Sequence, residues 1–150
     1  RDVERSRGLG DVYKRQYLGQ GDNETYSDRM QSGKIALYQT TAERMFHYYV
    51  TPQSTGNRTD VRWMKLTDET GQGIFVDSNR PFQFSVIPFA DDVLEKARHI
   101  NDLERNGHVT VHLDAEQAGV GTATCGPGVQ PQYRVPVTEQ SFEFTLRTVK

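Results

Sequence analysis

Strict alternation of apolar and polar residues recurs along this chain and points to a fold built from strands. The segment 81–89, for example, places Phe82, Phe84 and Val86 on one face. A period of two over five or more residues is typical of half-buried antiparallel strands. Other segments with alternating, aromatic or β-branched residues lie at 44–50, 60–68, 73–77, 108–114 and 141–149. Gly, Asn, Asp and Pro separate these segments, as expected for turns.

One segment has a different period. Between Asp91 and Leu103 the apolar residues Val93, Leu94 and Ala97 recur at helical spacing. Asp91 is placed to act as the N-cap of this helix. The sequence therefore predicts an all-β fold, an antiparallel β-sandwich, with one short helix near residues 91–103.

The composition excludes several classes of function. The 150 residues are 35% hydrophobic and carry a net charge of -2, so the basic surface that nucleic-acid binding needs is not indicated. No apolar run is long enough to cross a membrane, so no membrane partner is expected. A single cysteine, Cys125, excludes an internal disulfide and argues against structural zinc. His47, His108 and His112 lack metal-ligand spacing, and no cofactor or metal is expected in this segment.

The first 16 residues are interpreted as foreign to the protein. The stretch from Ser6 to Gln16 can be read as the translation of a transposase adapter used to prepare sequencing libraries, and Arg1-Asp2 fits the same source. Residues 1–16 are therefore expected to be a disordered, non-native tail. The natural start would then be missing, and residues 17–150 would be the C-terminal part of a longer protein.

Three stretches rich in Gly, Asn, Asp and Arg flank the predicted strands, at 18–29, 52–63 and 118–134. Loops held on a rigid sheet are the usual place for binding residues. Within the first stretch, Glu24, Asp28 and Arg29 are expected to form a polar cluster that ties a loop to the sheet. Asp60 and Arg62 are expected to form a structural ion pair beside a core aromatic, Trp63. His99 is expected to be a packed or capping histidine near the end of the helix.

In order, "GQGDNETYSDR", "PQSTGNRTDVRW", a phenylalanine-rich strand, "ARHINDL" and "GVGTATCGPGV" resemble the C-terminal domain, the small-chain region, of glycoside hydrolase family 2 β-galactosidases. The resemblance covers essentially all of residues 17–150. It implies the C-terminal half of a large antiparallel supersandwich. It also implies a parent enzyme that cleaves terminal β-galactosides with retention, by means of two carboxylates that lie upstream and are absent here.

Cys125 is the one substrate-binding residue that the resemblance implies. In this family a loop of the last domain places a Trp or a Cys against the aglycone, and the motif puts Cys125 at that position. From the residues alone, Cys125 reads equally as a small buried hydrophobe in a glycine-rich turn. No catalytic residue is expected in the segment.

The resemblance also implies the partners: a lactose-like β-galactoside, the remainder of the parent chain, and a homo-oligomer of the parent. Mg²⁺ and Na⁺ are possible in the parent enzyme. Two alternatives stay open, a separately encoded small subunit of a β-galactosidase and a non-catalytic carbohydrate-binding sandwich. The second would show an exposed aromatic platform, whereas the aromatics here mostly alternate into the expected core. Localisation is open between bacterial cytoplasm and periplasm.

Overall fold

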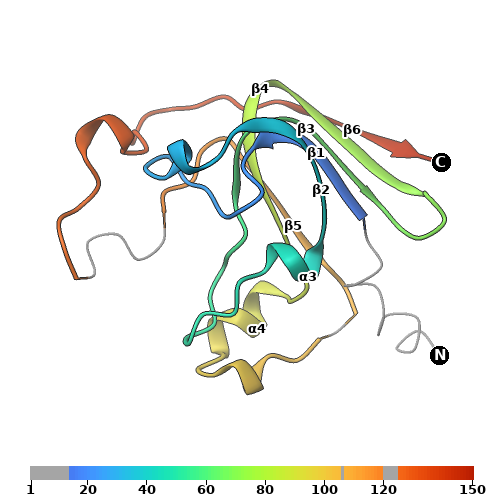
Figure 1. The fold of residues 1–150 in the computed structure, drawn as a ribbon, viewed down its shortest axis with the longest axis horizontal. Coiled ribbons are helices and arrows are strands. Elements are labelled where there is room, and N and C mark those ends of the chain that lie inside the picture. Colours follow the sequence, from blue (N-terminus) through green and yellow to red (C-terminus); the bar gives the residue numbers. More distant parts are fainter. Residues whose placement is uncertain (1–13, 106, 120–124) are drawn as a thin grey trace.

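A computed structural model describes residues 14–105, 107–119 and 125–150, and it consists mainly of antiparallel strands (Figure 1). The elements are β1 (Lys14–Gln20), η1 (Met30–Ser32), β2 (Ile35–Thr41), α3 (Ala42–Met45), β3 (Arg58–Thr67), β4 (Gly73–Ile87), α4 (Asp91–Lys96), η2 (Ile100–Asp102), β5 (Thr110–Asp114), η3 (Pro131–Tyr133) and β6 (Phe144–Val149). The strand order is β2-β1-β3-β4-β5, and β6 pairs with the first part of β4. The predicted all-β antiparallel fold with short helices is confirmed.

The long strand β4 belongs to two layers of this fold. Its first part, from Gly73 to Ser78, pairs with β6, and its last part, from Gln83 to Ile87, pairs with β5. Pro81 lies in the stretch between these parts, where the register against β3 shifts. Proline cannot donate to a ladder and is found at such irregular positions. A strand that passes from one layer to the other through a bend is a recognised way to make the corner of a sandwich.

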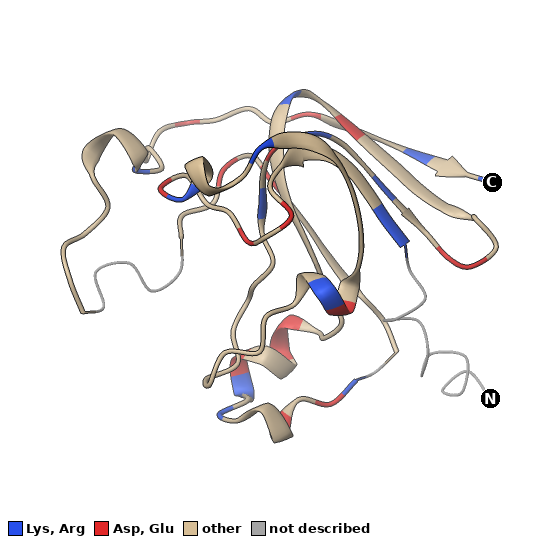
Figure 2. Ribbon diagram, in the orientation of Figure 1, with Lys and Arg blue, Asp and Glu red and all other residues tan. Residues whose placement is uncertain are grey.

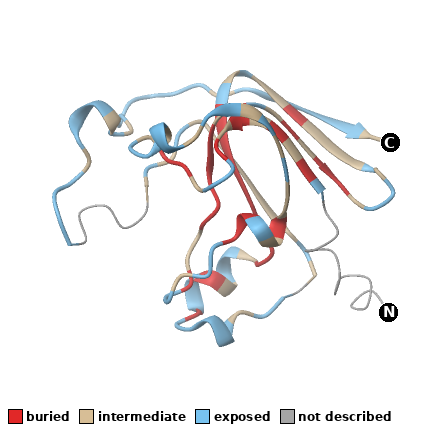
Figure 3. Cartoon of the chain, viewed as in Figure 1, coloured by how far each residue is buried: buried red, intermediate tan, exposed pale blue. Residues whose placement is uncertain are grey.

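The core lies between the two parts of β4. The ring of Phe84 meets the ring of Tyr17 edge-on, with 5.2 Å between ring centroids. Met64 and Val76 pack in the same cluster, and Ala42 of α3 closes it. Figure 3 shows buried positions gathered along β1, β3, β4 and α3, while the connection from 125 to β6 is mainly exposed. A smaller cluster of Phe46, Ile87, Phe89 and Leu94 attaches α4 to the sheet.

The prediction of a strand at 44–50 is wrong. The hydroxyl oxygen of Thr41 accepts a hydrogen bond from the backbone N–H of Arg44, and this cap starts the short helix α3. The aromatic residues after α3 pack at separate sites and do not form a strand. Phe46 enters the smaller cluster, and the ring of His47 stacks edge-on against Tyr49 at 4.3 Å.

The helix predicted at 91–103 is split in two. Helix α4 ends at Lys96, and η2 covers only Ile100–Asp102. The carboxylate of Asp102 accepts the backbone N–H groups of Arg98 and His99, so it caps a new turn instead of continuing the old one. His99 is the N-cap of η2, which is a capping role. Asp91 is not the N-cap of α4, because that position is Ala90.

Strands β1 and β2 were not predicted, and β1 begins inside the expected tail. Lys14, Arg15 and Gln16 pair with β2 on one side and β3 on the other, although disorder was expected up to Gln16. The physical reason is that the hydrogen bonds between strands join backbone groups. The residues just before Tyr17 can therefore continue the strand whatever side chains they carry. Arg15 is fully buried as a result. Residues 1–13 of the expected tail lie outside the described residues.

Candidate functional site

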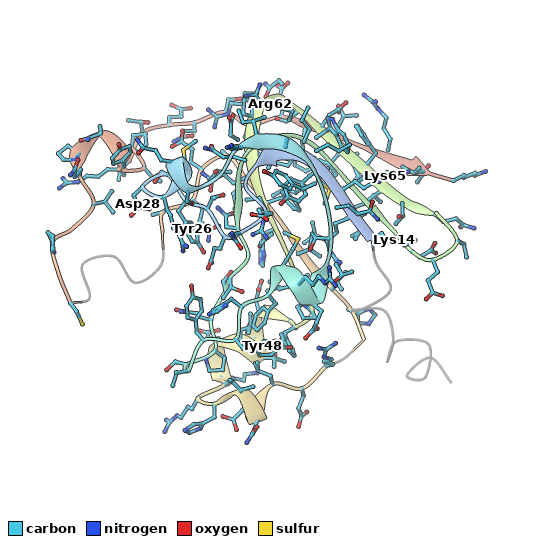
Figure 4. All side chains as sticks on the ribbon, in the orientation of Figure 1. Lys14, Tyr26, Asp28, Tyr48, Arg62 and Lys65 are labelled. Carbon is cyan, nitrogen blue, oxygen red and sulfur yellow. The ribbon has the colours of Figure 1, made fainter. Side chains whose placement is uncertain are left out.

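Glu24 joins the first two of the three polar loops. One oxygen of its carboxylate accepts hydrogen bonds from the hydroxyl of Tyr26 at 2.5 Å and the backbone N–H of Gly56 at 3.2 Å. The other oxygen accepts a hydrogen bond from the hydroxyl of Tyr49 at 2.9 Å. The loop after β1, which carries Tyr26 and Asp28 in Figure 4, is therefore held against the loop before β3. Glu24 was expected to tie a loop to the sheet, but its three partners all lie in loops, so it joins loop to loop instead.

A buried set of hydrogen bonds continues this connection beneath Glu24. The hydroxyl oxygen of Thr25 accepts the backbone N–H of Thr59 at 3.0 Å. The side-chain amide of Asn57 donates to the carbonyl of Thr25 at 2.9 Å and to the side-chain oxygen of Gln83 at 2.6 Å. All four residues are buried. Buried polar groups need such partners, so these bonds fix the two loops to β3 and β4.

Arg58 is the cation at the centre of this arrangement, and it is only 2% exposed. Its guanidinium donates to the hydroxyl of Tyr17 at 3.0 Å, to the carbonyl of Gly56 at 2.9 Å and to the carbonyl of Asp22 at 2.7 Å. Arg58 thus ties both loops to the sheet from below. Arg58 lies in the predicted polar stretch 52–63, but it was not predicted individually. The available signal was an arginine directly between a polar loop and a strong strand pattern.

The phenols around Glu24 are held in their protonated form. Burial raises the pKa of Tyr26 well above its ordinary value, and the hydrogen bond to Glu24 raises it further. The pKa of Tyr49 is also raised, first by burial and then by Glu24. Both hydroxyls therefore act as hydrogen-bond donors to the carboxylate at neutral pH.

A polar pocket of about 390 Å³ lies beside this arrangement. Glu24, Tyr49 and Arg58 line it, together with residues from the loop after β1 and from α3. Arg29 also lines this pocket, but within the described part of the chain its guanidinium makes no hydrogen bond or ion pair. Arg29 therefore shares the pocket with Glu24 and lies near Tyr49, but among the described residues no ion pair joins Arg29 to Glu24.

Asp60 and Arg62 form the predicted ion pair, with 3.2 Å between the guanidinium and the carboxylate. Asp60 has a φ of 52°, a left-handed conformation that is rare outside glycine, and it lies where β3 bulges against β4. The prediction that Trp63 is a core aromatic is wrong. Trp63 alternates with buried Met64, and it stacks half-buried on Phe75 of β4 at 5.6 Å, on the face opposite the core.

Ser85, His112 and Asp91 form a chain of hydrogen bonds that the sequence did not reveal. The Ser85 hydroxyl lies 2.9 Å from Nδ1 of His112, and Nε2 of His112 lies 3.1 Å from the carboxylate of Asp91. These residue types also occur in hydrolase triads, but Ser85 is 2% exposed and is paired within the β4–β5 ladder. A nucleophile must reach its substrate. These hydrogen bonds therefore attach α4 to the sheet.

Cys125 lies at an exposed position in the connection that leads to η3. Residues 120–124 of the third polar loop lie outside the described residues. Later residues of that loop are held in place by two hydrogen bonds. The Ser27 hydroxyl donates to the carbonyl of Tyr133 at 2.7 Å, and the guanidinium of Arg134 donates to the carbonyl of Val129 at 3.0 Å. A second pocket of about 320 Å³ lies at this junction.

Among the described residues, no three His, Cys, Asp or Glu side chains come together in a way that could hold a metal ion. No helix in the same part of the chain is both long and apolar enough to cross a membrane.

The fold and its joined loops define an antiparallel β-sandwich module that holds polar loops in place on a rigid sheet. The family model for the β-galactosidase small chain matches residues 9–146. Among curated proteins, a β-galactosidase BgaC of Bifidobacterium adolescentis is 37% identical over 128 residues, which are 82% of this chain and 12% of that protein. A β-galactosidase of Kluyveromyces lactis is 34% identical over 92% of this chain and 13% of its own length.

This chain therefore belongs to the β-galactosidase small chain family. A third relative, a β-galactosidase of Actinobacillus pleuropneumoniae, is 28% identical over 87% of the chain, and 12% of that protein is covered. The chain thus spans about an eighth of the length of these relatives.

Proposed function

We propose that this chain is the C-terminal part of a β-galactosidase that hydrolyses terminal β-D-galactosides with retention of configuration. The observation that carries the proposal is the family match over 9–146, combined with relatives about seven times as long that bear the name β-galactosidase. The segment supplies a structural domain, and it is inactive alone because both catalytic carboxylates belong to the rest of the enzyme.

The role proposed for Cys125 is to form the wall of the pocket on the aglycone side, against the sugar or alcohol that leaves. Its exposed position supports an encounter with a group from outside this chain. A thiol is small and cannot stack on a sugar ring, whereas the apolar face of a tryptophan can. The aglycone site formed with Cys125 is therefore wide and binds its ligand weakly.

The family description also supports a second candidate, because it names a small chain. In that case the same segment is a separately encoded subunit, and activity requires association with a large subunit that carries the barrel. The two candidates share the chemistry and differ only in whether a peptide bond joins the parts.

The test is to recover the DNA upstream of the Tyr17 codon from the source and to express the complete reading frame. A frame that extends through a barrel and hydrolyses an aryl galactoside supports the single-chain enzyme. A start codon shortly before Tyr17, with activity only after a large subunit is added, supports the small subunit. Lack of galactosidase activity in either form, with sugar binding by the short chain alone, would instead indicate a carbohydrate-binding module, for which the Trp63–Phe75 pair is a platform.

A further inference from the structure

The polar pocket beside Glu24 combines an excess of positive charge with two guanidinium groups that make no hydrogen bond or ion pair within the described part of the chain. Three arginines line it, Arg29, Arg44 and Arg58, against two carboxylates, Asp22 and Glu24. Figure 2 shows both signs of charge on α3 and on the loop after β1. The chain as a whole is slightly acidic, with a net charge of -2, so an arginine-rich pocket departs from its average.

Two of the charges in this pocket already have partners. The carboxylate of Glu24 accepts three hydrogen bonds, from Tyr26, Tyr49 and Gly56. The guanidinium of Arg58 is buried and donates to carbonyl groups and to the Tyr17 hydroxyl. These two side chains form a fixed wall of the pocket, because their charged groups are already hydrogen-bonded within the protein.

Arg29 and Arg44 are different, because both are exposed and line the same pocket from two separate elements. Within the described part of the chain, neither guanidinium makes a hydrogen bond or an ion pair. The neighbouring carboxylate of Glu43 is paired with Arg105 instead. Guanidinium groups bind phosphate and carboxylate through paired, charge-assisted hydrogen bonds.

We propose that this pocket binds an anionic group, a phosphate or a carboxylate, between Arg29 and Arg44. The side-chain amide of Asn23 and the ring of His47 also line the pocket and offer further donors. Its volume of about 390 Å³ accommodates a small anion with its bound water. The Asp22 carboxylate also lines the pocket, and its negative charge weakens the site without cancelling two arginines.

The first test is a calorimetric titration with inorganic phosphate at low ionic strength, on the 150-residue chain carrying Leu37→Lys, a charge placed on the exposed outer face of the sheet to keep the chain monomeric. We expect one saturable site, and the double variant Arg29→Ala/Arg44→Ala should bind at least about tenfold more weakly because charge-assisted bonds are lost. Asp22→Asn should strengthen binding, since it removes a repulsive charge. The matched control is Arg98→Ala, which deletes the same charge from an exposed position outside the pocket. No saturable binding, or an equal loss in Arg98→Ala, would overturn the proposal.

A second measurement does not depend on substitutions. An arginine-selective dicarbonyl reagent should modify Arg29, Arg44 and Arg98 in the free chain, and phosphate should protect only the first two from modification, as read by mass spectrometry. Equal modification of all three with phosphate present would contradict the site.

The same labelling distinguishes the two sources of the anion. In the complete enzyme, protection of Arg29 and Arg44 without added phosphate would identify a carboxylate of the enzyme itself as the ligand. Protection that requires phosphate would identify a free anion. Labelling of both arginines in both proteins, whatever the phosphate concentration, would reject either form of the proposal.

Discussion

At the scale of single residues, the role proposed for Cys125 leads to a prediction about the leaving group. In a β-galactosidase that contains this segment, Cys125→Trp should add a stacking surface on the aglycone side. We expect KM or the transglycosylation ratio for lactose to change several-fold, in line with about 0.5–1.5 kcal/mol for an added aromatic contact. A small aryl galactoside should respond less. Equal effects on both substrates would mean that Cys125 is merely packed. Steady-state kinetics with product analysis is the measurement.

The phenols beside Glu24 lead to a prediction about alkaline pH. The pKa values of Tyr26 and Tyr49 are raised in the folded chain, so both stay protonated where the unfolded chain has begun to ionise. The unfolded state then binds fewer protons, and the free energy of unfolding should fall as pH rises above about 10, the ordinary pKa of tyrosine. Urea unfolding at about pH 9 and pH 11 measures this fall.

The variant Tyr26→Phe provides the matched comparison for this pH dependence. It should be less stable at neutral pH, because a hydrogen bond to Glu24 is lost, yet its stability should depend less on pH above about 10. Circular dichroism at neutral pH checks that it is folded. An unchanged slope in both Tyr26→Phe and Tyr49→Phe would show that other groups govern the alkaline transition.

The role of a site residue could be predicted only where its own type and its sequence neighbours indicate that role. The Asp60–Arg62 ion pair was predicted and is found, whereas Glu24, expected to tie a loop to the sheet, joins two loops. Arg58 was missed because its role depends on carbonyl groups from both loops, which the fold alone brings together. The assignment of Cys125 to the aglycone side stays a prediction, since it concerns a contact with parts of an enzyme beyond this chain.

At the scale of elements, the turn before β3 depends on one glycine. Gly56 has a φ of 80°, and an added Cβ would lie 2.4 Å from the carbonyl oxygen of Met45 in α3. Gly71, in the β3–β4 turn, has a φ of 88° but open space around it. We expect Gly71→Ala to cost about 1 kcal/mol of unfolding free energy from the backbone alone. Gly56→Ala should cost at least about 3 kcal/mol, because the steric clash is added.

Denaturant unfolding of the two glycine variants tests this difference, since both share the same backbone strain and differ in contacts. Similar losses in the two variants would show that the loop between α3 and β3 can move away from Met45. In that case the hydrogen bond from Gly56 to Glu24 would not hold the loops in place.

The strands that were predicted correctly have an alternating pattern of apolar residues in their own sequence. The strands that were missed form because of the strands they pair with. Alternation over 60–68 and 81–89 predicted β3 and the last part of β4, because one face of each is buried. Strand β2 was missed because apolar residues lie on both of its faces: Ile35 and Leu37 are exposed, while Tyr38 packs against the core, so the alternation that marks a half-buried strand is lacking. The aromatic run 44–50 was wrongly predicted as a strand, since its rings fill separate sites without a partner strand.

At the scale of the whole molecule, apolar residues from three strands adjoin one another on the face of the sheet opposite the core, and within the described part of the chain they are half-buried or exposed. Leu37 is 64% exposed and Ile35 is 52% exposed, and the register places Leu37 beside Leu18, which in turn lies beside Trp63. These residues come from β2, β1 and β3 and share one surface. Strand β2 is also at the edge of the sheet order, where backbone groups are available for pairing. A surface of this kind is typical of contact with another protein part.

We therefore expect the chain expressed alone to self-associate at micromolar concentration or to be poorly soluble. Leu37→Lys should shift it towards the monomer, because a charge at the centre of the apolar face opposes its burial in a contact. Val50→Lys is the control, since Val50 is 88% exposed but lies in the loop between α3 and β3. Sedimentation velocity over a range of concentrations separates these outcomes.

A monomer with a cooperative thermal transition at every concentration would contradict the expectation, and it would mean that this segment folds as an independent unit whose outer face tolerates water. Association that Leu37→Lys and Val50→Lys weaken equally would place the contact elsewhere than on this face, and the edge of β2 would then be the surface to alter next.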